Sequence, residues 1–348
     1  MKTNPGNFFE DFTVGQVIEH ATPRTVTEGD RALYGAIYPT RFAIPSSAEF
    51  AASVGLAAAD GSGHPVEELI GFHIAFGKTV PDVSLNAVAN LGYAECRFHV
   101  PVVPGDTLRT RSEVIGLKQN SNGRTGVVWV RSTATNQRGE VAIDWARWVM
   151  VHKRSADSPT PETVVPDLAD VVASEDLVVP RGLDLTAYDV AAAGEPHRLG
   201  DYEVGERIDH VDGVTLTDAE HMMATRLWQN TAKVHFSTDA RPDGRRLVYG
   251  GHVISLARAL AFNGLANAQL VAAVNAGAHV APAFAGDTVH AWSEVLDTAT
   301  LDAPGVGALR LRLVATRGRD ESMTLRAPGG TYADGVLLDL DYWALIPR

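Results

Sequence analysis

An internal repeat is the feature that most constrains the fold of this chain. Residues 11–15 are Asp-Phe-Thr-Val-Gly, and Ile18 and His20 follow them. Residues 201–210 read Asp-Tyr-Glu-Val-Gly and place Ile208 and His210 at the same distances. Two further pairs of segments repeat in the same order, 105–114 with 286–295 and 143–148 with 338–343. Such widely spaced, ordered matches indicate a duplicated fold, because a solenoid repeat would have a much shorter period.

The repeat also predicts how the chain is divided. A length of 348 residues fits about two domains. We expect an N-terminal unit over residues 1–153, a linker over residues 154–197 and a C-terminal unit over residues 198–348. The linker is rich in proline and acidic residues, and its Val and Leu residues indicate that it partly packs on the two units.

Composition excludes several classes of protein. Hydrophobic residues make up 45% of the chain and charged residues 21%, which is typical of a soluble globular protein. The net charge of −12 argues against general nucleic-acid binding, which needs a basic surface. Cys96 is the only cysteine, so a disulfide framework or a multi-cysteine metal site is excluded. Without the apolar run of a signal peptide or a membrane span, we expect a soluble, cytoplasmic protein that binds no membrane.

Each copy combines a short opening segment, an apolar helical stretch and several long strands. The segment Val253–Leu265 is apolar nearly all round, which predicts a buried helix. The predicted strands cover residues 108–117, 125–135 and 141–151 in the first copy, and 289–296, 309–315 and 335–346 in the second. A buried helix wrapped by a curved antiparallel sheet is a hotdog unit. We therefore expect an α+β double hotdog, whose two sheets can join edge to edge and so cover their edge strands.

Polar residues concentrate in the second copy between positions 217 and 252, and here the sequence resembles a known family. In the MaoC-like, or (R)-specific enoyl-CoA hydratase, family a segment Asp-x-Asn-Pro-x-His supplies an Asp and a His, and a later Val-His-Gly opens the buried helix. This chain has Asn230 and His235 at the same spacing, and Val248-Tyr249-Gly250 at the later motif. The resemblance implies that His235 and Asn230 are catalytic.

Longer motifs resemble one branch of that family more closely. Residues 4–12, 21–25, 76–82 and 229–232 are similar to the mesaconyl-CoA hydratase branch, also described as 2-methylfumaryl-CoA hydratase or β-methylmalyl-CoA dehydratase. The resemblance covers almost the whole chain and is weakest in the linker. It implies a hydro-lyase that reversibly adds water to mesaconyl-CoA, a coenzyme A thioester, to give β-methylmalyl-CoA. It also implies that the enzyme needs no metal or redox cofactor, and that it is a homodimer.

The residue types fit this chemistry. Hydration of an enoyl thioester places negative charge on the thioester oxygen, which backbone N–H groups at a helix N-terminus can stabilise. Gly250 and Gly251 stand at that position and permit close approach of a substrate to the backbone. His235 can polarise a water molecule, since its ordinary pKa lies near the working pH. The alternative for His235 is a core histidine that only satisfies hydrogen bonds.

Asn230 departs from the family pattern, because an amide cannot exchange a proton as a carboxylate does. Either His235 alone cycles the proton or another group helps, and His252 and Tyr249 are candidates for this supporting role. For His252 the alternative is a packing residue at the start of the helix. Asp218 and Glu220 are more typical of a helix start, since Thr217-Asp218 is a capping sequence.

The first copy lacks the Asn/His pair, so we expect it to be the degenerate, substrate-binding half. The free carboxylate of a mesaconyl group needs a cationic partner, and Arg41 and Arg226 are the candidates. Arg245 and Arg246 are the candidates for the phosphates of coenzyme A. In each case the alternative is an ordinary surface charge.

Two other functions remain open from the sequence. A hotdog acyl-CoA thioesterase would release free thiol, and the hydratase-like pattern from His235 to Gly251 argues against it. A non-catalytic acyl-CoA-binding protein would bind the same esters without turnover. A regulator role is weakened because no DNA-reading module accompanies the two units.

Overall fold

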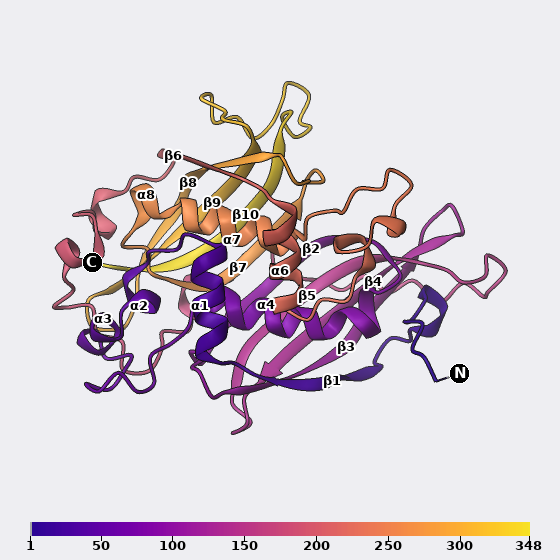
Figure 1. The fold of residues 1–348 in the computed structure, drawn as a ribbon, viewed down its shortest axis with the longest axis horizontal. Coiled ribbons are helices and arrows are strands. Elements are labelled where there is room, and N and C mark those ends of the chain that lie inside the picture. The colour runs from indigo at the N-terminus through magenta and orange to yellow at the C-terminus, as the bar shows by residue number, and fades with distance from the viewer. Residues whose placement is uncertain (1) are drawn as a thin grey trace.

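Two antiparallel half-sheets join side by side into one ten-stranded sheet (Figure 1). The computed structural model describes residues 2–348. The strand order is β1-β3-β4-β5-β2-β7-β10-β9-β8-β6, so the C-terminal half repeats the N-terminal half in reverse order. At the junction β2 and β7 pair antiparallel, with Ala94 opposite Ala276. This pairing confirms the predicted edge-to-edge joining and leaves β1 and β6 as the edges of the sheet.

The strands have the following bounds. The N-terminal half contains β1 (Val17–Thr25), β2 (Ala87–Phe98), β3 (Thr107–Gln119), β4 (Thr125–Thr135) and β5 (Val141–His152). The C-terminal half contains β6 (Arg207–Thr215), β7 (Leu270–His279), β8 (Thr288–Thr300), β9 (Val306–Arg317) and β10 (Val336–Pro347). All six strands predicted from the sequence are present, within a few residues of their predicted ends.

Two long helices, α4 (Glu68–Thr79) and α7 (Gly250–Leu260), lie side by side at the centre of the molecule in Figure 1. A hydrogen bond of 2.9 Å between His73 Nε2 and Ser255 Oγ joins them. Every residue from Leu69 to Thr79 and from Gly251 to Leu260 is buried, as expected for helices that are apolar all round. The predicted helix at Val253–Leu265 is confirmed. It begins earlier, at Gly250, and ends at Leu260; the short α8 (Phe262–Leu265) that follows contains a kink at Asn263 and Gly264.

The remaining helices are shorter than α4 and α7. They are α1 (Glu28–Ile37), α2 (Ala43–Ser46), α3 (Ala48–Ser53), α5 (Val190–Ala193) and α6 (Asp218–Leu227), with 3-10 turns at Phe9–Asp11, Ser174–Asp176, Leu199–Asp201, Lys233–His235 and Thr238–Ala240 and a π turn at Val80–Ser84. Thr27 and Thr217 cap α1 and α6 in the same way, each accepting a backbone N–H three residues later. Within residues 2–348, no helix combines the length and the apolar character needed to cross a membrane.

Matching hydrogen bonds show that the two halves are copies of one fold. The Val66 N–H donates to the Val102 carbonyl in one half, and the Val248 N–H donates to the Ala283 carbonyl in the other. His20 and His210 each place Nε2 2.8 Å from a serine hydroxyl on the adjoining strand. This correspondence makes the start of α4, at Glu67 and Glu68, equivalent to the start of α7, at Tyr249 and Gly250.

The segment between the halves packs along the sheet. Val172, Leu183, Leu185 and Tyr188 are buried in a cluster with residues of β7, β9 and β10. The Trp343 indole N–H donates to the Val172 carbonyl over 3.0 Å. This segment therefore stabilises the C-terminal half as well as connecting it.

Candidate active site

A cavity of about 320 Å³ opens where the two halves meet. Its walls come from α4, β2 and β5 of the N-terminal half, and from α7, β7 and the segment 230–249 of the C-terminal half. Most of the lining is apolar. The polar and aromatic-hydroxyl side chains that line it are Ser84, Asn90, Tyr93, Arg147, Asn230, His235, Tyr249 and His279.

His235 is held in a form that can accept a proton. It ends the 3-10 turn Lys233–His235, and its Nδ1 lies 2.9 Å from the Leu247 carbonyl oxygen. Because a carbonyl can only accept, Nδ1 carries the hydrogen and Nε2 keeps its lone pair. Burial lowers the pKa of His235 to about 4, against the Leu247 hydrogen bond, which acts to raise it. The imidazole is therefore neutral at neutral pH and can act as a base.

Asn230 is fixed beside this base by its own backbone. It follows Gln229, which has a left-handed φ of 53° and turns the chain sharply at the end of α6. The Asn230 Oδ1 accepts the Ala232 N–H over 2.9 Å, and the Asn230 N–H donates to the Thr225 carbonyl over 3.1 Å. Within residues 2–348 its Nδ2 donates no hydrogen bond, so this group can hold a water or substrate oxygen at the cavity.

The N-terminus of α7 forms the floor of the cavity. Tyr249 is the N-cap residue and gives no side-chain cap, so the N–H groups of Gly250 and Gly251 have no partner inside the helix. Gly250 lines the cavity, and a Cβ atom there would lie 2.4 Å from Cε1 of His279. Position 250 therefore has no room for a side chain, and the exposed N–H is available to an oxyanion.

His279 and Tyr93 lie in the cavity wall and were not predicted from the sequence. They come from the paired strands β7 and β2, and Tyr93 Oη lies 2.9 Å from His279 Nε2. Burial, with a smaller contribution from His235, lowers the pKa of His279 to about 4. The cavity therefore holds a second neutral imidazole. The only sequence signal was a histidine at the end of a mostly apolar strand, whose other polar residue is Asn275.

The predicted supporting residues have different environments. Tyr249 lines the cavity, and its ring packs against that of His235 with centroids 5.6 Å apart. His252 does not line it; its Nδ1 lies 2.9 Å from the Tyr38 hydroxyl, in the buried interior between the halves. Asp218 forms an ion pair with Arg246 near the start of α6, consistent with its expected helix-start role.

The predicted carboxylate-binding arginines do not line the cavity. Arg41 is exposed and stacks over the Phe262 ring at 4.4 Å, and Arg226 is exposed on α6. Arg41 lies in the loop between α1 and α2, and Arg226 lies on the exposed side of α6, so neither side chain reaches the cavity. The arginine that does line it is Arg147, which is fully buried on β5. We therefore do not place the carboxylate site at Arg41 or Arg226.

The two arginines predicted to bind phosphate differ from each other. Arg246 is held by Asp218 at 2.8 Å. Arg245 is exposed, stacks over the Phe284 ring at 3.8 Å and forms no ion pair among residues 2–348. It stands two residues before Leu247, which lines the cavity. Arg245 therefore remains the candidate for binding the phosphates of coenzyme A.

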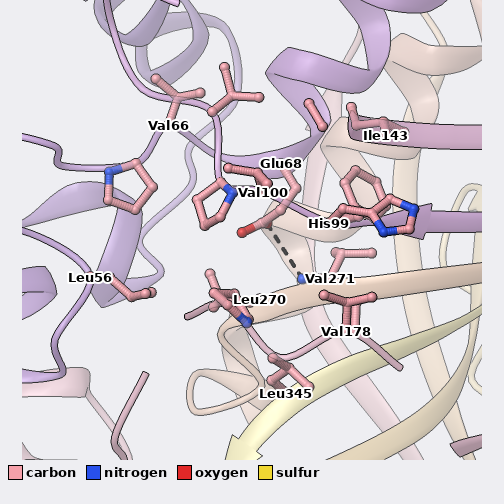
Figure 2. A pocket seen from close by; sticks show the side chains of 17 residues that line it. Leu56, Val66, Glu68, His99, Val100, Ile143, Val178, Leu270, Val271 and Leu345 are labelled. Atoms are coloured by element: carbon pink, nitrogen blue, oxygen red, sulfur yellow. Dashed lines mark hydrogen bonds between the residues drawn. The ribbon is translucent and has the colours of Figure 1, made fainter. Parts of the chain in front are cut away.

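The equivalent position in the other half is almost filled (Figure 2). A pocket of about 30 Å³ lies at the start of α4, lined by Val66, Glu68 and residues 98–102, which correspond to Val248, Gly250 and the segment 279–283 of the large cavity. Figure 2 shows the Glu68 side chain directed at the backbone of Val271, whose N–H it accepts at 3.4 Å. Leu56, Val178 and Pro180 add to the lining. One of the two equivalent sites is therefore open and the other is closed.

Comparisons with solved structures define the class of protein. A structure described as a putative MaoC domain protein dehydratase from Chloroflexus aurantiacus has a TM-score of 0.96 and 56% identity, covering 100% of this chain and 99% of the other. A conserved hypothetical protein from Mycobacterium tuberculosis, described as a double hotdog fold, has a TM-score of 0.74 and 27% identity, covering 98% of both chains. The chain is a MaoC-like double hotdog protein, which confirms the predicted fold class.

Comparisons of sequence place it within that class. The family model for mesaconyl-CoA hydratase matches residues 2–325. A protein from Cereibacter sphaeroides named mesaconyl-CoA hydratase is 65% identical over 348 residues, all of both chains. A protein from Chloroflexus aurantiacus named beta-methylmalyl-CoA dehydratase is 57% identical over 354 residues, covering 100% of this chain and 99% of the relative. The chain belongs to the mesaconyl-CoA hydratase family, as the motifs predicted.

Proposed function

We propose that this protein catalyses the reversible addition of water to mesaconyl-CoA (2-methylfumaryl-CoA), giving β-methylmalyl-CoA. Membership of the family supports the substrate, and the names of the two relatives, a hydratase and a dehydratase, describe the two directions of this reaction. The observation that carries the proposal is one cavity that contains both a neutral His235 and the uncapped N-terminus of α7.

In the proposed reaction His235 Nε2 takes a proton from a water molecule as the water oxygen bonds to Cβ of the enoyl thioester. The π electrons move toward the thioester, and its oxygen becomes an enolate oxygen. The Gly250 N–H and the positive end of α7 stabilise that charge. The enolate then takes the proton back from His235 at Cα. Water has been added across the double bond, and His235 is neutral again.

This route accounts for the asparagine at position 230. The proton that His235 removes from water is the one required at Cα, so a single proton-exchanging group is sufficient. Asn230 Oδ1 is occupied by the Ala232 N–H, which leaves Nδ2 to hold the attacking water. The alternative acid/base pair is His279 on β7 and Tyr93 on the paired strand β2, which are hydrogen-bonded to each other. The route uses only protein groups and water.

The direct test follows the enoyl-CoA absorbance of mesaconyl-CoA with wild type and with His235→Ala. Wild type should consume it, and the variant should lose about 10²–10⁴-fold in kcat while still binding CoA esters. His152→Ala is the matched control, since His152 is exposed at the end of β5. Full activity in both variants would show that His235 is not the catalytic base, and His279 would then be tested in the same way.

Unchanged absorbance with wild type would refute hydration. A thiol reagent in the same assay would then separate the two alternatives. Release of free coenzyme A would indicate the thioesterase, and binding of the ester without either signal would indicate a non-catalytic acyl-CoA-binding protein.

We also propose that the protein is a homodimer in the cytoplasm. The family resemblance supports the dimer, and the buried free thiol of Cys96 fits a reducing compartment. Light scattering after gel filtration should give twice the chain mass of 37.2 kDa. A mass equal to that of one chain would refute the dimer.

A further inference from the structure

Arg147 is a buried cation for which residues 2–348 provide no anion. Its side chain is fully buried, yet it lines the large cavity. Nη2 donates to Thr79 Oγ1 over 2.7 Å and to Ser84 Oγ over 3.4 Å, and Nη1 reaches Asn90 Oδ1 over 3.5 Å. All three acceptors are neutral, and no carboxylate within residues 2–348 forms an ion pair with it.

Two polar atoms at this place also lack partners. Arg147 Nε and Asn90 Nδ2 are buried donors without a hydrogen bond. The guanidinium lies over the Phe76 ring at 4.3 Å, which leaves its edge as the direction in which an acceptor can bind. Burial lowers the pKa of Arg147 to about 10, so the group is still charged at neutral pH. An uncompensated buried charge is costly, and an anionic ligand would remove that cost.

A second buried arginine shows what a structural role looks like in this protein. Arg258 on α7 donates to the Ala268 and Gln269 carbonyls. It also lies close enough to the buried carboxyls of Glu67 and Glu68 to act on the pKa of both. Arg258 thus has acidic neighbours inside the protein, whereas in the described part of the chain no acidic side chain forms an ion pair with Arg147.

The comparison of the two halves points the same way. Trp148 on β5 and Trp343 on β10 are matched positions of the repeat, so Arg147 corresponds to Tyr342. The open cavity therefore has an arginine in its β5 wall, whereas the closed pocket has a carboxylate, Glu68, at the start of its helix. The cationic group belongs to the open cavity alone.

We propose that Arg147, together with Asn90 and Ser84, binds the free carboxylate of the acyl group and so selects dicarboxylic enoyl-CoA thioesters. The choice of ester rests on the proposed function. Arginine suits this role because its planar guanidinium pairs with both oxygens of a carboxylate. In 2-methylfumaryl-CoA the carboxylate is attached to Cβ, so the subsite would also present that carbon to the water activated by His235.

The test compares two substrates that differ at the proposed subsite. Tiglyl-CoA has the carbon skeleton of 2-methylfumaryl-CoA with a methyl group in place of the carboxylate. In Arg147→Met, which removes the charge at similar volume, kcat/KM for mesaconyl-CoA should fall by about 100-fold or more, whereas any activity on tiglyl-CoA should change by less than about threefold. Equal losses on both substrates would overturn the proposal.

A second variant keeps Arg147 in place in case its removal disturbs folding. Asn90→Asp supplies an internal carboxylate next to Nη1, which should pair with the guanidinium and repel the carboxylate of the substrate. We expect the same selective loss on mesaconyl-CoA. Arg41→Ala and Arg226→Ala are the controls, and both should behave as wild type. If Arg226→Ala instead lost activity on mesaconyl-CoA alone, the carboxylate would have to bind at Arg226.

Binding of saturated esters separates this proposal from the proposed function. Methylsuccinyl-CoA and 2-methylbutyryl-CoA cannot be hydrated and differ only by the carboxylate. Calorimetry should show that wild type prefers methylsuccinyl-CoA by about 100-fold and that Arg147→Met abolishes the preference. If mesaconyl-CoA is not hydrated but this preference exists and depends on Arg147, the subsite stands and the hydratase fails. If mesaconyl-CoA is hydrated without such a preference, the subsite fails alone.

Discussion

At the scale of single residues, the site depends on how one imidazole is protonated. The Leu247 carbonyl fixes the hydrogen of His235 on Nδ1, and burial keeps the ring neutral. A carboxylate at position 230 would stabilise the protonated ring, whereas an amide does not. Asn230 therefore preserves a weak base that returns its proton easily, which suits a reaction in which one group removes and restores the same proton.

The protonation of His235 should set the pH dependence of kcat/KM. Protonated His235 cannot accept a proton, so activity should stay constant down to about pH 5 and then fall about tenfold per pH unit below its pKa of about 4. Asn230→Asp should raise that pKa and move the decline toward the ordinary histidine value of 6.5. Initial rates across this pH range, with circular dichroism to confirm folding, provide the measurement. A decline at the same pH in both proteins would show that position 230 does not act on His235.

At the scale of elements, the start of α7 depends on close packing that only glycine permits. In Gly250→Ala the new Cβ would lie 2.4 Å from the His279 ring, so either the ring or the helix start must move. We expect kcat to fall by about 10²–10³-fold, the usual cost of losing one oxyanion donor. Gly35→Ala is the matched control because it lies on exposed α1 with open space around its Cβ. The control should keep full activity, and an active Gly250→Ala would mean that the oxyanion binds elsewhere.

The elements also show how far the sequence can be interpreted. Alternation along the strands and the all-apolar helix predicted β3, β4, β5 and α7 within a few residues, because those patterns are local. Asn230, His235 and Gly250 were found because one segment carries their motif. Arg147 and His279 were missed because they lie in strands that resemble their neighbours, and only the packing of the two halves brings them to one cavity.

At the scale of the whole molecule, duplication has produced one open site from two equivalent positions. The open cavity takes walls from both halves, so the N-terminal copy contributes Tyr93 and Arg147 although it lacks the Asn/His pair. That the first copy is the substrate-binding half stays a prediction. At the equivalent position Glu68 replaces the glycine, and burial together with the neighbouring Glu67 raises its pKa to about 8. The Glu68 side chain fills space that Gly250 leaves open at the start of α7, so an acyl group cannot reach the start of α4.

The chain should therefore bind one substrate rather than two. The pocket at the start of α4 has a volume of about 30 Å³, compared with about 320 Å³ for the open cavity, and cannot accept an acyl group. Titration calorimetry with methylsuccinyl-CoA should give one site per chain. Glu68→Gly should leave this number unchanged, because Leu56, Val178 and Pro180 would still line and narrow the pocket. Two sites per chain in wild type would show that the linker segment opens and that both halves bind substrate. A second site only in Glu68→Gly would show that the single glutamate, and not the linker, keeps the duplicated site closed.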